Sequence, residues 1–199
     1  MMVSEFEMSM IEDLSYFIGL QIKQMKNSTF VSQGKYIKDM LKKFGMDDSK
    51  AISTPIGTNG NLDSDASGNM VDQKMYRSMI GSLLYVTASR PVVMFSVCMC
   101  ARFQASPRES FESNKENIEV LEAYTKCWIV VSQRCRFELI RYSDSDYAGC
   151  KVERKSTSST YQLLGRSLIS WPSKMQNSIA LSTTKAEYIL ASSCCAQLL

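Results

Sequence analysis

Residues 137–144, FELIRYSD, open the last third of the chain and decide its fold. They form a largely apolar run that ends in a carboxylate. The composition of this stretch predicts a strand. Two more strands are predicted downstream, in SSTYQLLG (158–165) and SLISW (167–171), with a short turn between them. The last third of the chain therefore begins as a run of consecutive strands.

A helix follows these strands. NSIAL (177–181) either extends the third strand or follows it, and residues 182–199 have the apolar spacing of a helix. Three consecutive strands followed by a helix predict an α+β fold.

A hairpin is predicted near the start of the chain. Residues 15–24 alternate, with Ile18, Leu20 and Ile22 on one face, as in a half-buried strand. A turn at 26–29 leads into TFVSQ, which has the composition of a returning strand.

Three helices are predicted between the hairpin and the last third of the chain. The first, at 35–45, ends at Gly45, and the second begins with Asp72 as its N-cap and ends before Arg90. Pro91 suits the first turn of the third. The residues expected to form their apolar faces are Tyr36, Ile37, Met40, Leu41, Phe44, Met75, Met79, Leu83, Val86, Phe95, Cys98 and Phe103.

The composition excludes several classes of function. The net charge of +3 leaves any nucleic-acid contact to local basic patches. There are seven cysteines but no histidine and no C-x-x-C pair, which excludes a structural zinc site. DSDASG (63–68) begins like a calcium loop, but Lys74 stands where that loop needs a glutamate.

The setting of the protein is also predicted from composition. The first residues do not read as a signal peptide, and no apolar run is long enough to cross a bilayer. We therefore expect no membrane partner and an intracellular location, cytoplasmic or nuclear and not secreted, with free thiols in a reducing environment.

Two carboxylates are candidates for chemistry, Asp144 at a strand end and Glu187 in the first turns of the last helix. A strand carboxylate and a helix carboxylate can converge on two divalent ions that cleave a phosphodiester, and such a site needs about four carboxylates. Spacing alone leaves structural alternatives open. A D-x-D pattern at a strand end is more often a turn, and a glutamate in the first turns of a helix complements the helix dipole. Lys35, Lys38 and Lys42 likewise form either a solvated helix face or a phosphate contact.

Five stretches occur in the order of a known family: FIGLQIKQ…FVSQGKYIKDMLKKFGM, STPIGTNG, DQKMYRSMIGSLLYVTASRP, YSDSDYAGCKVERKSTSS and ISWPSKMQNSIALSTTKAEY. Together they resemble the Pol polyprotein of Ty1/copia-type retrotransposons, most like the plant elements. The resemblance covers nearly the whole chain except about 110–136.

The resemblance implies a division of the chain. Residues 1–50 correspond to the end of the reverse-transcriptase palm and the start of the thumb. Residues 51–109 correspond to the thumb and connection, with a flexible linker at 57–70. Residues 137–199 correspond to the first part of a ribonuclease H domain, a truncated mixed sheet with one helix.

The resemblance also implies site residues. Asp144 matches the family's first ribonuclease H aspartate, Glu187 matches its helix glutamate, and Asp146 is an auxiliary metal ligand at most. The implied cofactor is Mg²⁺, and the implied partner is an RNA–DNA hybrid or another nucleic acid. The lysine row at 35, 38 and 42 becomes a candidate for contact with the template–primer backbone.

Departures from the family pattern predict a loss of catalysis. The chain lacks the polymerase motif Tyr-x-Asp-Asp, which the resemblance places upstream of residue 1. It also lacks the two later ribonuclease H aspartates, which the resemblance places beyond Leu199, so half of the negative charge needed to hold two ions remains. We therefore expect that this fragment does not bind Mg²⁺. Lys185 replaces a glutamate that would complete a capping box, Pro172 lies in or beside a strand, and Arg141 replaces a glycine.

Residues 110–136 do not match the family at all. The stretch 117–135 reads like the family segment translated one nucleotide out of frame, which indicates two compensating frameshifts. We expect low order or packing unlike the family's there, although CWIVVS (127–132) has strand composition.

Three hypotheses follow. The first is a degenerate Pol fragment without catalysis of its own that binds nucleic acid weakly. The second is a ribonuclease H that cleaves RNA in RNA–DNA hybrids with Asp144, Glu187 and carboxylates from a partner chain. The third is a domesticated protein-interaction module. The sequence does not predict an oligomeric state.

Overall fold

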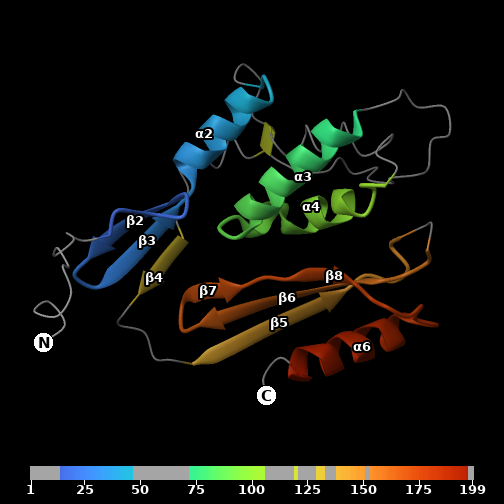
Figure 1. The fold of residues 1–199 in the computed structure, drawn as a ribbon. Helices are drawn as coiled ribbons and strands as arrows, with labels where there is room; N and C mark the ends of the chain where they lie inside the picture. The colour runs from blue at the N-terminus through green and yellow to red at the C-terminus, as the bar shows by residue number, and fades with distance from the viewer. Residues whose placement is uncertain are drawn as a thin grey trace, which may run out of the picture.

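The computed structural model describes residues 14–46, 72–105, 119–120, 129–132, 138–150 and 153–196. The linker predicted at 57–70 and most of the segment 110–136 lie outside the described residues. Two antiparallel four-stranded sheets and several helices make up the described chain (Figure 1). The predicted α+β class is confirmed, whereas the palm, thumb and ribonuclease H assignments and their boundaries stay predictions.

The first sheet contains the predicted hairpin. Its strand order is β1 (Tyr16–Phe17), β2 (Leu20–Met25), β3 (Ser28–Ser32) and β4 (Ile129–Ser132). β2 and β3 pair through the predicted turn, in a register that sets Ile22 opposite Val31. β4 comes from the segment predicted to be frameshifted, and its strand composition is confirmed because Val130 pairs with Phe30 of β3.

The prediction of one continuous strand over 15–24 is wrong. The chain turns at Ile18 and Gly19, so that Tyr16 and Phe17 fold back onto β2. Both turn residues have positive φ, +44° at Ile18 and +75° at Gly19. Ile18 is therefore 69% exposed instead of sharing a half-buried face with Leu20 and Ile22.

The three predicted central helices are present. They are α2 (Gly34–Lys43), α3 (Gln73–Thr87) and α4 (Met94–Ala101), the last preceded by the 3₁₀ turn η1 (Pro91–Val93). Asp72 is the N-cap of α3, where its side chain accepts a hydrogen bond from Lys74 N at 2.9 Å. Gly45 follows α2 with a φ of +66°, as a C-terminal glycine does.

The three helices share one apolar core. Its buried side chains include Ile37 of α2, Leu83 of α3 and Val97 of α4, together with Val120. Burying one such side chain contributes about 1.5–3 kcal/mol. The predicted faces are only partly right. Met75 and Phe95 are exposed, and Phe103 lies beyond the end of α4.

The second sheet contains the strands predicted in the last third. β6 (Thr157–Leu164) is central, with β5 (Leu139–Ser145) along one edge and β7 (Ser167–Ser170) and β8 (Ser173–Met175) along the other. Every described pair is antiparallel, so the mixed sheet implied by the resemblance is wrong for these residues. A two-residue turn joins β6 to β7, and so short a connection permits only antiparallel pairing.

Pro172 separates β7 from β8. Its carbonyl accepts a hydrogen bond from Thr160 N at 3.1 Å, so the chain stays against β6 across the interruption. The proline thus marks an irregularity in an edge strand, where its missing N–H removes no ladder bond. Residues 177–181 form no strand.

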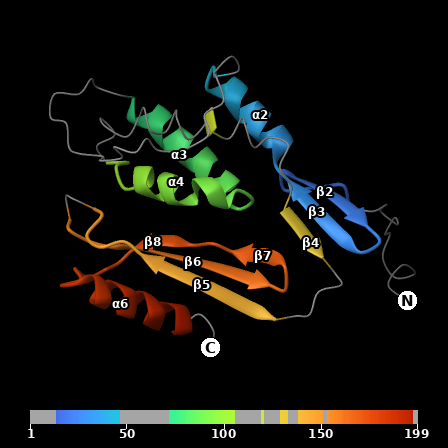
Figure 2. The ribbon, with the colours of Figure 1, turned by 180° about the vertical axis from the view of Figure 1, so that it is seen from behind.

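Helix α6 (Thr183–Ala196) ends the described chain. It lies along β5 on one side of the second sheet, while α4 approaches the opposite side near β8 (Figures 1 and 2). Only Ala186 and Leu190 of α6 are buried, fewer than its predicted apolar stripe. Among the described helices, none is long and apolar enough to cross a membrane.

Candidate functional site

Asp144 lies near the end of β5, directly opposite Ser159 of β6. Side chains alternate across a strand, so Asp144 shares a face with Tyr142 and not with Arg141. Arg141 reaches α6, where Nη1 donates to the carbonyl of Cys194 at 2.7 Å. Asp144 therefore points away from α6, and its carboxylate is exposed.

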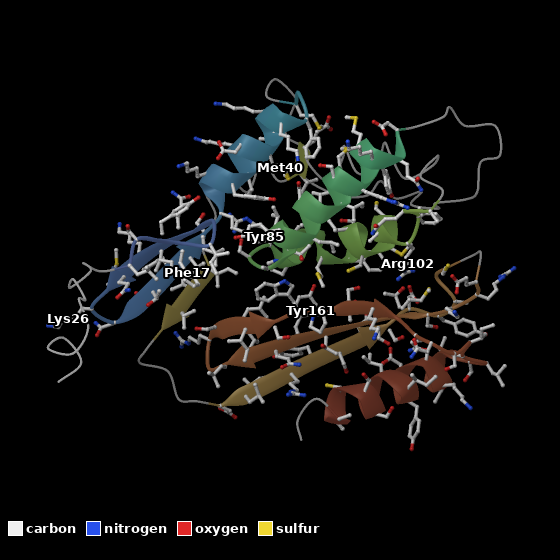
Figure 3. All side chains as sticks on the ribbon, viewed as in Figure 1. Phe17, Lys26, Met40, Tyr85, Arg102 and Tyr161 are labelled. Atoms are coloured by element: carbon white, nitrogen blue, oxygen red, sulfur yellow. The ribbon has the colours of Figure 1, made fainter. Side chains whose placement is uncertain are left out.

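The opposite face of the sheet is marked by α4. Thr157 lies on the same face of β6 as Ser159, and Arg102 Nη2 donates to Thr157 Oγ1 at 3.2 Å. Arg102 lies just after the last residue of α4 (labelled in Figure 3). Because Ser159 pairs with Asp144, the Asp144 carboxylate is on the α4 side of the sheet.

Glu187 approaches the same strand from α6. Its Oε1 accepts a hydrogen bond from the backbone N–H of Ser145 at 3.1 Å. This N–H lies on the free edge of β5, because the neighbouring residue Asp146 makes the bond to Thr157 of β6. The structure thus brings Glu187 next to the Asp144 backbone, but from the other face of the sheet.

Asp146 serves the turn after β5. Its Oδ1 accepts from Thr157 N at 2.5 Å, and its own N–H donates to the carbonyl of Thr157 at 3.1 Å. Its Oδ2 packs so closely on Gly149 that a Cβ there would collide with it. These contacts correspond to the turn alternative left open for the D-x-D pattern.

The donors in the described residues do not fit a two-magnesium centre. Across the described ranges, no three His, Cys, Asp or Glu side chains lie close enough together to hold a metal ion. Asp144 and Glu187 supply two of the roughly four carboxylates that two Mg²⁺ ions need. No magnesium-dependent step follows from this arrangement. The metal-ligand roles that the resemblance implies for Asp144, Glu187 and Asp146 stay predictions, as does the expected lack of Mg²⁺ binding by the fragment.

The three predicted lysines lie on one exposed face of α2. Lys35, Lys38 and Lys42 are separated by three and four residues, which sets them along one side of the helix. The opposite side carries the buried core residues Ile37 and Leu41.

The charged residues of α2 differ in what they contact. The Lys35 ammonium lies over the Tyr16 ring at 5.5 Å from its centroid, which is cation–π geometry. Lys43 is turned to another face, where Nζ donates to Ser78 Oγ at 2.8 Å. Asp39 is the acidic residue exposed within the row.

Some contacts between the second sheet and α6 cannot be predicted from the sequence, because they join residues far apart in the chain. Gln176 is the clearest case, since its buried Nε2 lies 2.9–3.1 Å from Ser145 Oγ, Ser158 Oγ and the carbonyl oxygen of Ala186 and shares its two hydrogens among these acceptors. It ties β5 and β6 to α6. Arg141 does the same at the other end of α6.

Of the two cysteines in α4, Cys100 is buried in the core and Cys98 is half-buried. Burial raises the pKa of the Cys98 thiol, an effect that the positive charge of Arg102 partly offsets. A thiol with a raised pKa is a poor nucleophile at neutral pH.

Comparison with known proteins identifies the family. The chain is 32% identical over 178 residues to the retrovirus-related Pol polyprotein from transposon RE1 of Arabidopsis thaliana, covering 89% of this chain and 12% of that protein. It is 32% identical over 196 residues to the corresponding polyprotein from transposon TNT 1-94 of Nicotiana tabacum, covering 94% of this chain and 15% of that one.

A shorter relative matches over most of its own length. The uncharacterized mitochondrial protein AtMg00810 of Arabidopsis thaliana is 31% identical over 186 residues, which are 93% of this chain and 77% of that protein. The chain belongs to the retrovirus-related Pol polyproteins of copia-type transposons, of the plant type. No protein-family model and no solved structure matches it.

Proposed function

We propose that this chain is a degenerate Pol fragment that binds nucleic acid weakly through the exposed lysine face of α2 and has no catalysis of its own. The observation that carries the binding part is the row of Lys35, Lys38 and Lys42 on the exposed side of a helix whose other side is anchored in the core. A helix anchored in the core keeps the Cα atoms of the three lysines along one line, from which their flexible side chains extend into solvent.

The partner class follows from the chemistry of the row. Lysine ammonium groups bind phosphate oxygens as point charges and read no base sequence. We therefore propose an RNA–DNA hybrid or another nucleic acid, bound with little sequence preference. A net charge of +3 adds little attraction beyond the row itself.

The absence of independent catalysis is supported by the donor set. Asp144 of β5 points to the face of the sheet opposite the one that Glu187 approaches from α6, and Glu187 is engaged by the Ser145 N–H. Asp146 is engaged by Thr157. Two carboxylates balance too little of the charge of two divalent ions to hold them beside a phosphate.

Salt-dependent binding tests the proposal. Fluorescence anisotropy of a labelled 20-base-pair RNA–DNA hybrid should show weak binding whose logarithmic affinity falls with the logarithm of salt concentration. Three phosphate contacts give a slope of about −2.7. Replacing Lys35, Lys38 and Lys42 together with alanine should remove most of this slope.

A matched triple variant is the control. Lys74, Lys174 and Lys185 are exposed lysines on α3, β8 and α6, and their replacement changes the net charge equally. The control variant should keep the slope of the unaltered protein. Equal losses in the two triple variants would mean that total charge, and not the α2 face, drives binding.

Ribonuclease H activity is the second candidate, because Glu187 and the strand end at Asp144 are neighbours. The purified chain with millimolar Mg²⁺ should leave the RNA of a hybrid intact. Cleavage that disappears in Glu187→Gln would establish this candidate and overturn the first.

A further inference from the structure

The turn between β1 and β2 is strained. Ile18 adopts a φ of +44° and Gly19 a φ of +75°. A β-branched residue rarely has positive φ, and such a conformation persists only where its surroundings hold it. The holding contact comes from α3, 67 positions further along the chain.

Tyr85 of α3 is the residue in contact with this turn. Its hydroxyl donates a hydrogen bond to the carbonyl of Ile18. A Cβ built on Gly19 would lie 2.7 Å from the Tyr85 hydroxyl oxygen, so only glycine leaves room for the hydroxyl group. Figure 3 shows Tyr85 at the end of α3 that points toward the first sheet.

The same tyrosine is packed against α2. Its ring meets that of Tyr36 edge-on, with centroids 4.7 Å apart. Its carbonyl accepts from Gln33 Nε2 at 3.2 Å, and fully buried Gln33 is itself held by Ser89 Oγ at 2.5 Å. Tyr85 therefore contacts both the turn and the start of the lysine-bearing helix.

Lys35 takes its position from the strands that this turn connects. Its ammonium lies over the Tyr16 ring, and its backbone N–H donates to Gln21 Oε1 at 3.1 Å. Tyr16 and Gln21 are directly opposite each other in β1 and β2. The turn therefore joins the two strands that carry the partners of Lys35.

We propose that Tyr85 is a positioning residue: it holds the β1–β2 turn against α2 and thereby fixes Lys35 at the head of the lysine row. This inference rests on the proposed nucleic-acid binding for its functional consequence, but the contact itself is testable without any ligand. Tyr85 bears no positive charge, and its hydroxyl donates to the carbonyl of Ile18.

Affinity and salt slope separate positioning from direct contact. Tyr85→Phe removes only the hydroxyl, and the affinity for the hybrid at fixed salt should fall two- to threefold with an unchanged slope. Lys35→Ala should lower the affinity and also reduce the slope by about 0.9, the share of one phosphate contact. Tyr161→Phe, at an exposed tyrosine of β6, is the control and should change neither.

The ligand-free measurement is hydrogen exchange in the turn. Tyr85→Phe should speed exchange of the Gly19 and Leu20 amides while leaving the core of α3 protected. A double-mutant cycle adds a second measure. Gly19→Ala should cost less stability in the Tyr85→Phe background than in the unaltered protein, because the nearest colliding atom is gone.

The outcomes distinguish the two proposals. If the unaltered protein does not bind the hybrid, the proposed function fails, and exchange and the cycle still decide whether Tyr85 holds the turn. Unchanged exchange at Gly19 together with additive costs in the cycle would overturn the positioning role. A slope that falls in Tyr85→Phe as far as in Lys35→Ala would also overturn it.

Discussion

The guanidinium of Arg141 donates to the carbonyl of Cys194 over 2.7 Å, which links the middle of β5 to the last turn of α6. A cation at this place complements the negative end of the helix dipole. Arg141, which replaces a glycine of the family pattern, therefore connects β5 to α6 in this fold.

Replacing Arg141 with methionine should lower the free energy of unfolding. A hydrogen bond from a charged donor contributes about 1.5–3 kcal/mol, and the low end applies here because the buried Nε of Arg141 has no partner in the described structure. Urea unfolding followed by circular dichroism measures the change. Arg166→Met, in the exposed β6–β7 turn, is the control, and equal effects of the two variants would contradict the role of the Cys194 contact.

The α3 core can be tested with two adjacent leucines. Leu83 is fully buried and Leu84 is 40% exposed. Leu83→Ala should destabilise the protein by about 2–5 kcal/mol, because it leaves a cavity among the three helices. Leu84→Ala should change stability by about 0.5 kcal/mol or less. Similar losses, measured by thermal or urea unfolding, would show that α3 does not face the core as described.

Two glycines should respond to alanine with opposite signs. Gly81 lies inside α3 with open space around an added Cβ, and removing its excess backbone freedom should raise the free energy of unfolding by about 0.5–1 kcal/mol. Gly45 also has open space, but its φ is +66°, so alanine there should cost about 1 kcal/mol. The test is urea unfolding, and a stabilised Gly45→Ala would refute the assigned helix end.

Lys185→Glu should stabilise α6. Ser182 Oγ already accepts from Lys185 N at 3.1 Å, so Ser182 caps the helix, and a glutamate at position 185 would complete the capping box. Reversing a charge near the helix N-terminus should add about 0.3–1 kcal/mol at low salt. Lys174→Glu on β8 makes the same change of charge away from a helix end. The prediction fails if both variants shift the unfolding midpoint equally.

Elements set by local chemistry could be predicted from the sequence. Asp72 as a cap, Gly45 as a helix end and the turn of the β2–β3 hairpin all depend on neighbours within a few residues. The exposed lysine row of α2 was predictable for the same reason, since helical spacing alone sets Lys35, Lys38 and Lys42 opposite the apolar face.

Features set by distant contacts could not be predicted in this way. The break at Ile18 is in contact with Tyr85; Gly19 interrupts the strand pattern there, but a glycine alone does not identify so distant a partner. The relation of Asp144 to Glu187 depends on which face of β5 the helix covers, which neither residue type nor spacing specifies. The intracellular setting and the nucleic-acid partner stay predictions.

The pairing of β3 with β4 bears on how this chain acquires its shape. Phe30 meets Val130, so one edge of the first sheet is supplied by residues made about a hundred positions later. During synthesis the hairpin therefore emerges with β3 unpaired along that edge, a surface open to mispairing with other nascent chains. Contacts of such long sequence separation also form slowly. Truncating the chain before residue 129 would make that transient hazard permanent.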